Sequence, residues 1–243
     1  MVFISPVLNI LSRNIRTSSK LIIRDYNEIE NLQSSITGTE KFVNFSLKKI
    51  QKNIEENLLK IRPGYKINYL DENQNFASDR NCWLVSLIDG LSNFKNAIPH
   101  FCTSISLKEN NEIISSIVYD PLKDELFQAE KEKGCFLNDF RIKSSEKILS
   151  SILVSSFYKT LEFPNEVIQD FTKIKILGSP ILDICYLAAG RADLIFHYGY
   201  NKSFYQLTNL ILKEANCNSI VNESESNFFL ASNRKTKQKL INI

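Results

Sequence analysis

Two apolar stripes at helical spacing run through the first 62 residues, and they constrain the fold more than any other feature. Ser5-Pro6 is typical of a helix start, because serine caps well and proline suits the first helical position; this helix is expected to reach about Tyr26. The second stripe runs from about Asn44 to Arg62, and Pro63-Gly64 ends it. The sequence therefore predicts a helix pair that covers one face of a sheet.

After residue 82 the hydrophobic pattern changes to the short runs that are typical of strands. Asn110-Asn111 and Asp120-Pro121 are the turns expected between them. The predicted strands of this half comprise residues 83–88, 101–107, 112–119, 125–130 and 134–137. Short turns between consecutive strands predict an antiparallel meander beneath the helix pair.

The second half alternates short strands with further helices. Helices are expected from Ser179-Pro180 to Gly190, from Ser203 to Ala215, and at the C-terminus. The predicted strands are residues 152–155, 173–177, 193–198, the neighbourhood of Val221, and 228–231. Because helices and antiparallel strands are expected to be segregated in layers, the predicted fold class is α+β. We expect two halves, residues 1–145 and 146–243, packed as one compact structural unit.

The composition excludes several classes of protein. The chain is 43% hydrophobic, which is enough for a sizeable core, and its net charge of +3 comes from scattered basic residues. The densest basic cluster, residues 234–239, is interpreted as a solvated helix face. Five widely spaced cysteines without a C-x-x-C pair predict neither disulfides nor a zinc ribbon. No apolar run reaches the roughly 20 residues of a membrane span, so we expect a cytoplasmic protein without membrane contact.

The stretch WLVSLIDGLSNF, residues 83–94, ends an apolar run with Asp-Gly at a polar turn. A carboxylate that follows a strand in this way is typical of a metal-binding loop. The run before Asp89 carries no acidic residue, however. The stretch is therefore either a metal motif or the remains of one.

Several segments around this motif resemble the inositol monophosphatases, most closely the bacterial extragenic-suppressor (SuhB) type. The frame W-x-x-x-x-[IL]-D-G-x-x-N-F matches at residues 83–94, and P-H-F-x-x-S-I matches at 99–105. Two longer matches follow in the family's order, IVYDPLKDELFQAEKEKGCFLND at 117–139 and GSPILDICYLAAGRADLIF at 178–196. The resemblance extends over most of the chain. It implies a layered sandwich in which antiparallel sheets alternate with helix pairs.

The resemblance also implies a chemistry, the Mg²⁺-dependent hydrolysis of inositol phosphate or similar small phosphomonoesters. Mg²⁺ prefers hard oxygen ligands in octahedral geometry. Bound ions clamp the phosphate and lower the pKa of the attacking water. In the family, acidic residues from several segments hold the metal, and a threonine and an aspartate orient the water.

Three acids remain at the family's metal positions, and two ligand positions are lost. Asp89 matches the second aspartate of the family's D-P-[IL]-D-G-T motif, while Asp71 and Glu72 fall on its G-E-E loop. The first aspartate of the former motif is replaced by Ser86, and the aspartate of the late P-W-D motif by Phe204. An aromatic ring cannot ligate Mg²⁺, so binding of the cofactor here is in doubt.

The positions that would activate water are apolar. The family's threonine falls on Leu91 and its water-orienting aspartate on Leu47, so no catalytic residue is intact. His197 stands where the family has a glutamate that contacts the substrate hydroxyls. The substrate-binding positions implied by the resemblance are Asp89, Gly90, Leu91, Ser92, Gly178, Ser179 and His197.

Each surviving residue also has a structural interpretation. Asp89 with Gly90 can form a capping turn as readily as a weak metal site, and Asp71 and Glu72 can be solvated loop acids. A packed or surface histidine is commoner than a catalytic one at a position such as His197. The remaining framework matches are interpreted as structural, namely His100, Asp183 and Asp193.

We therefore expect a catalytically impaired member of the family with a regulatory or scaffold role, since disturbing even the outer groups of a metal site costs about 10–100-fold. By analogy with bacterial members in ribosomal-RNA transcription antitermination, the expected partner is a transcription-machinery protein or RNA. The family resemblance also implies a homodimer. Two alternatives stay open: an active phosphomonoesterase with rearranged ligands, and a sensor that binds a phosphate ligand without hydrolysis.

Overall fold

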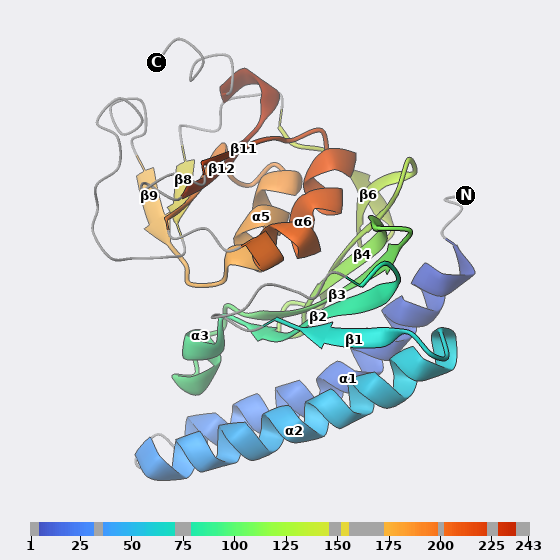
Figure 1. The fold of residues 1–243 in the computed structure, drawn as a ribbon. Helices are drawn as coiled ribbons and strands as arrows, with labels where there is room; N and C mark the ends of the chain where they lie inside the picture. Colours follow the sequence, from blue (N-terminus) through green and yellow to red (C-terminus); the bar gives the residue numbers. More distant parts are fainter. Residues whose placement is uncertain are drawn as a thin grey trace.

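The computed structural model describes residues 5–31, 36–70, 79–145, 152–155, 173–198, 202–222 and 228–236. These residues form four alternating layers (Figure 1). The helix pair α1 (Pro6–Asn31) and α2 (Ile36–Ile61) covers a seven-stranded sheet. Helices α5 (Pro180–Ala188) and α6 (Lys202–Glu214) separate that sheet from a five-stranded one. The predicted α+β sandwich is confirmed.

Both N-terminal helices are longer than their apolar stripes predict. α1 continues to Asn31 because Tyr26 and Ile29 extend its buried face. α2 begins at Ile36 although Gly38 disfavours a helix interior, since the buried Val43 keeps its first turns against the core. Tertiary packing therefore extends both helices toward the connection between them.

The seven-stranded sheet follows the sequence order of its strands. They are β1 (Lys66–Tyr69), β2 (Cys82–Asp89), β3 (Cys102–Glu109), β4 (Glu112–Asp120), β5 (Glu125–Glu130), β6 (Gly134–Leu137) and β7 (Phe140–Ile142). From β2 to β7 neighbours are antiparallel, as the meander predicts, while β1 pairs with β2 in parallel. The edge strands β1 and β7 were not expected, because they are short and only partly buried.

The five-stranded sheet is mixed. Its order is β11 (Asn218–Asn222), β12 (Phe228–Ser232), β10 (Leu194–Tyr198), β8 (Ile152–Ser155) and β9 (Lys173–Ile176). β12 pairs antiparallel with β10 and β11, whereas β8 pairs in parallel with β9 and β10. The expectation of antiparallel sheets is wrong for the β8–β9 and β8–β10 pairs, which are parallel. Parallel strands need long crossover connections, and α5 lies in the connection that leads from β9 to β10.

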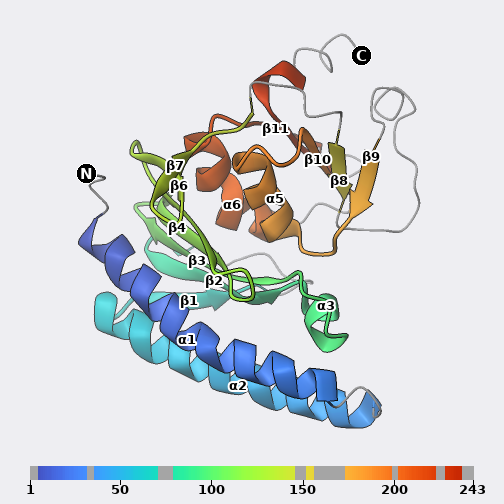
Figure 2. The same cartoon turned by 180° about the vertical axis from the view of Figure 1, so that it is seen from behind.

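The large sheet is buried on both faces. On β2, Trp83 and Val85 belong to the core shared with the helix pair, while Leu84 belongs to the core shared with α5 and α6. A third cluster fills the space between these helices and the small sheet, and the view from behind shows α5 and α6 enclosed between the sheets (Figure 2). The described helices include none that is long and apolar enough to cross a membrane. Of the terminal helix expected after residue 231, residues 234–236 are helical, and residues 237–243 lie outside the described residues.

Candidate functional site

The Asp-Gly pair of the opening motif lies where β2 ends. Gly90 has a φ of 81° and caps the short helix α3 (Leu91–Lys95). A Cβ at this position would lie 2.9 Å from the carbonyl oxygen of His100, so glycine is needed for the close approach as well as for the backbone angle. This turn leaves the Asp89 side chain pointing into the interior, beside the start of α5.

Asp89 is a buried carboxylate that binds the N-terminal end of α5. Its Oδ2 atom accepts hydrogen bonds from the Ser179 hydroxyl and from the backbone N–H of Ile181, the latter at 2.9 Å. The first N–H groups of a helix lack partners within the helix, and the helix dipole favours an anion there. Asp89 therefore caps α5 from a strand far away in the sequence.

Burial sets the protonation of this carboxyl group. Desolvation raises the pKa of Asp89 to about 7, and repulsion from Asp183 acts in the same direction. The hydrogen bonds from Ser179 and Ile181 oppose the shift. One oxygen of this carboxyl group is thus engaged by protein donors at the start of α5.

Two histidines flank the buried Asp183 of α5. The Nε2 atom of His100 lies 3.3 Å from Asp183 Oδ1, and that of His197 lies 3.9 Å from Asp183 Oδ2. The His197 ring also lies 5.8 Å from the ring of Phe229, measured between centroids. Both histidines are thus placed as packed partners of one carboxylate, which agrees with their structural interpretation; the substrate-binding role of His197 stays a prediction.

Asn93 ties the turn to the other loops of the site, and sequence reasoning assigned it no role. Its side-chain Nδ2 donates to the carbonyl oxygens of His100 and Leu177, both at 2.7 Å. Gly178 has a φ of 83°, and a Cβ there would approach the Asn93 amide to 3.1 Å. The signal was present in the family frame, where an asparagine follows Asp-Gly at fixed spacing. Ser92 lies beside it, in the first turn of α3.

The positions of the lost metal ligands carry no acid. Ser86 is buried on β2 and faces Ser104 across the β2–β3 pair. Phe204 is buried in the apolar cluster that also contains Cys102 and Ile181. Packing of a phenyl ring and a serine pair supplies none of the anionic oxygens that Mg²⁺ prefers.

The two positions of the water-activating pair are also apolar in their surroundings. Leu47 on α2 and Leu91 on α3 both pack, partly buried, against the cluster that contains Ile88 and Phe94. Neither side chain can accept a proton or hold a water. The prediction that these two positions have lost the family's water-orienting groups rests on the motif correspondence, and the packing of both leucines is compatible with it.

The described residues do not fit a magnesium site. No group of three or more His, Cys, Asp or Glu side chains among them is arranged to hold a metal ion. Asp71 and Glu72 lie outside the described residues, so their role as ligands stays a prediction.

The thiol nearest to Asp89 does not provide an alternative nucleophile. Cys102 Sγ lies 4.0 Å from Asp89 Oδ2 and 3.9 Å from Ser179 Oγ. Burial and the neighbouring Asp89 carboxylate raise the pKa of this thiol well above its usual value. Because the thiolate is the reactive form, this shift disfavours Cys102 as a nucleophile. All five cysteines are free thiols.

The described elements form a layered α+β sandwich in which the Asp89-Gly90 turn lies against the start of α5. The model of the inositol monophosphatase family matches residues 4–230. An inositol-1-monophosphatase of Rhizobium meliloti is 33% identical over 200 residues, which cover 78% of this chain and 75% of the relative. A Nus factor SuhB of Pasteurella multocida is 30% identical over 222 residues, with coverage of 87% and 83%.

Solved structures agree with these relatives. The extragenic suppressor protein SuhB of Bartonella henselae matches with a TM-score of 0.82 and 25% identity, over 97% of this chain and 98% of that one. An IMPase of Thermotoga maritima matches with a TM-score of 0.80 at 24% identity, over 97% and 95%, which supports the fold alone. The chain belongs to the inositol monophosphatase family, as its motifs predict.

Proposed function

We propose that this chain is a catalytically impaired member of its family, retained for a regulatory or scaffold role. The observation that carries the proposal is the use of Asp89. Its carboxylate caps α5 through Ser179 and Ile181, while Ser86 and Phe204 occupy the positions of two lost ligands. Such a site keeps the framework of the family's chemistry without its metal cluster.

The relatives support the kind of role that would remain. Several of them are named Nus factor SuhB, including those of Pasteurella multocida and Haemophilus influenzae. We propose a similar role here, in ribosomal-RNA transcription antitermination, with a protein of the transcription machinery or RNA as partner. Contacts of this kind depend on a folded surface and need no phosphate hydrolysis. A homodimer belongs to the same proposal, and light scattering of the purified chain tests it.

The activity is tested with purified protein, Mg²⁺ and inositol-1-phosphate, with the Rhizobium meliloti inositol-1-monophosphatase as positive control. We expect phosphate release at less than about a thousandth of an ordinary enzyme rate, which is on the order of 1–1,000 per second. Turnover within that ordinary range would contradict the proposal.

Metal binding separates the proposal from an enzyme with rearranged ligands. That alternative uses Asp71, Glu72, Asp89 and His197, so calorimetric titration with Mn²⁺ would show tight binding that Asp89→Asn abolishes. We expect no such binding. A phosphate ligand that raises the melting temperature without metal or turnover would instead favour a non-hydrolysing sensor.

A further inference from the structure

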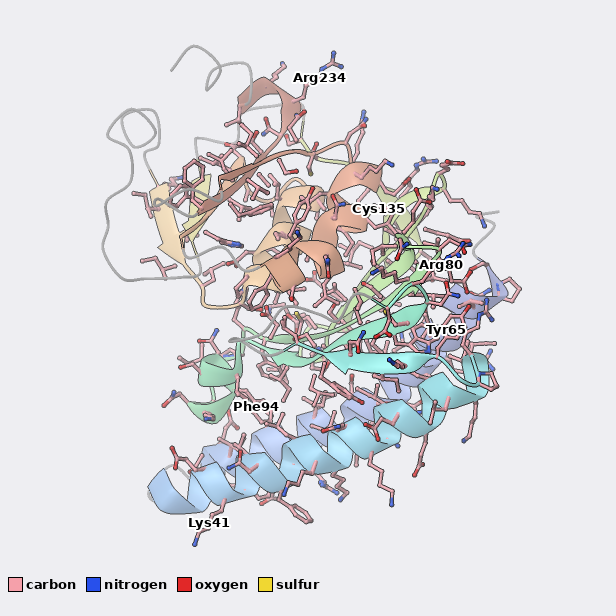
Figure 3. All side chains as sticks on the ribbon, viewed as in Figure 1. Lys41, Tyr65, Arg80, Phe94, Cys135 and Arg234 are labelled. Carbon is pink, nitrogen blue, oxygen red and sulfur yellow. The ribbon has the colours of Figure 1, made fainter. Side chains whose placement is uncertain are left out.

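A groove of about 300 Å³ lies along α6, away from the Asp89 turn. One wall is the face of α6 that carries Tyr205, Gln206, Asn209, Leu210 and Lys213. The other wall comes from the β3–β4 hairpin and the β5–β6 turn, through Lys108, Asn111, Glu112, Ile113 and Lys131. β2 starts at this end of the sheet and runs away from it. Arg80 lies just before the start of β2, and Phe94 lies beyond its far end (Figure 3).

The charges of the groove do not cancel. Three lysines line it against a single acid, Glu112. Glu112 forms an ion pair with Lys131, and the hydrogen bond from Lys131 and the charge of Lys213 lower its pKa. Of the ion pairs between described residues, none involves Lys108 or Lys213. The groove therefore presents a net positive charge from two ammonium groups.

The other side chains of the groove suit a peptide backbone. Asn111, Gln206 and Asn209 each carry an amide that donates and accepts, which matches the N–H and C=O groups of an extended chain. Ile113 and Leu210 supply apolar surface. From Tyr205 to Lys213 the helix rises about 12 Å, the length of three to four extended residues.

The same features fit nucleic acid less well. The Tyr205 ring packs against Phe229 at 5.5 Å between centroids, in a tilted arrangement that restricts its use for base stacking. No arginine lines the groove to form bidentate contacts with phosphate.

We propose that this groove binds a short acidic segment of a partner protein in extended conformation, with its carboxylates on Lys108 and Lys213. This acidic segment would be the partner that the proposed scaffold role requires, so the inference rests on that proposed function. The groove itself is separate from Asp89, so the two proposals fail independently. Turnover of inositol-1-phosphate would overturn the first, and the binding experiment below decides the second.

The test measures fluorescence anisotropy of a labelled peptide, Glu-Glu-Leu-Glu-Glu, with the full chain at constant ionic strength. We expect Lys108→Glu with Lys213→Glu to weaken binding at least about 10-fold, because two attractions become repulsions. The matched control is Lys41→Glu with Lys49→Glu on the exposed face of α2, which makes the same change of net charge. It should change binding less than about twofold.

Three results would overturn the proposal. The first is an absence of saturable binding, and the second is an equal loss in both double variants, which would indicate non-specific attraction. The third is displacement of the peptide by millimolar inorganic phosphate or by single-stranded RNA at the same ionic strength, which would assign the groove to another ligand class. Melting curves of each variant, together with the milder Lys108→Gln and Lys213→Gln pair, separate lost binding from lost folding.

Discussion

At the scale of single residues, Asp89 connects the site to stability through its titration. Its pKa rises from 3.8 in the unfolded chain to about 7 in the folded protein, so between these values the folded state binds the extra proton. Stability must then fall as the pH rises from about 4 to 7. Three pKa units correspond to a loss of at most about 4 kcal/mol in the free energy of unfolding over this pH range.

We therefore predict that Asp89→Asn removes most of this pH dependence. The asparagine oxygen can still accept from the Ile181 N–H, but the cost of a buried charge is gone. Denaturant unfolding at pH 4.5 and 7.5 should show the variant more stable than the natural protein at the higher pH, by about 1–3 kcal/mol, and similar at the lower one. The exposed Asp139→Asn variant should keep the natural profile. A variant that loses stability equally at both pH values would contradict the assignment.

The site shows how far residue-level reasoning extends. The motif WLVSLIDGLSNF identifies Asp89 and Gly90 as a special turn, and the family frame identifies the losses at Ser86 and Leu91. The capping of α5 joins residues 92 positions apart, so no local pattern contains it. For the same reason the link from Asn93 to Leu177 could not be predicted.

At the scale of elements, hydrophobic periodicity predicts the type and position of the long or buried helices and strands. The helix stripes and the strands from β2 to β6 follow it, because each buries a regular set of side chains against a neighbouring layer. β1 and β7 escape it, since an edge strand of three or four partly exposed residues carries almost no pattern. Hydrophobic periodicity also does not predict the strand directions in the small sheet, because these depend on the path of the crossover connections.

Asn93 holds α3 against the loop before α5, and this junction is testable. Asn93→Ala would leave the carbonyl oxygens of His100 and Leu177 without the hydrogen bonds that they now accept. We expect a loss of about 1–3 kcal/mol in the free energy of unfolding, since partly buried carbonyl groups without partners retain a desolvation cost. Asn96→Ala is the matched control, because that amide donates to the Ser92 carbonyl at an exposed position. A loss as large in the control would show that removing any side-chain amide hydrogen bond near α3, rather than the junction, is responsible.

At the scale of the whole molecule, α6 joins the layers. Leu207 is fully buried in the cluster between the large sheet and the interior helices, and its carbonyl oxygen accepts a hydrogen bond from Ser106 of β3 at 3.1 Å. The same helix contacts β11 of the small sheet. If residues 1–145 and 146–243 form one structural unit, as we propose, they must unfold together.

Leu207→Ala is the variant that tests this cooperativity. Removing the buried side chain should cost about 2–5 kcal/mol through lost transfer energy and the cavity left behind. In calorimetry we expect one transition, lowered by roughly 5–15 °C, because each kcal/mol shifts a chain of this size by about 2–4 °C. Lys202→Ala, at an exposed position of the same helix, should change stability by less than about 0.5 kcal/mol. If the variant instead split the transition and left one half at its original temperature, the halves would be separate units, because a shared core cannot lose packing on one side only.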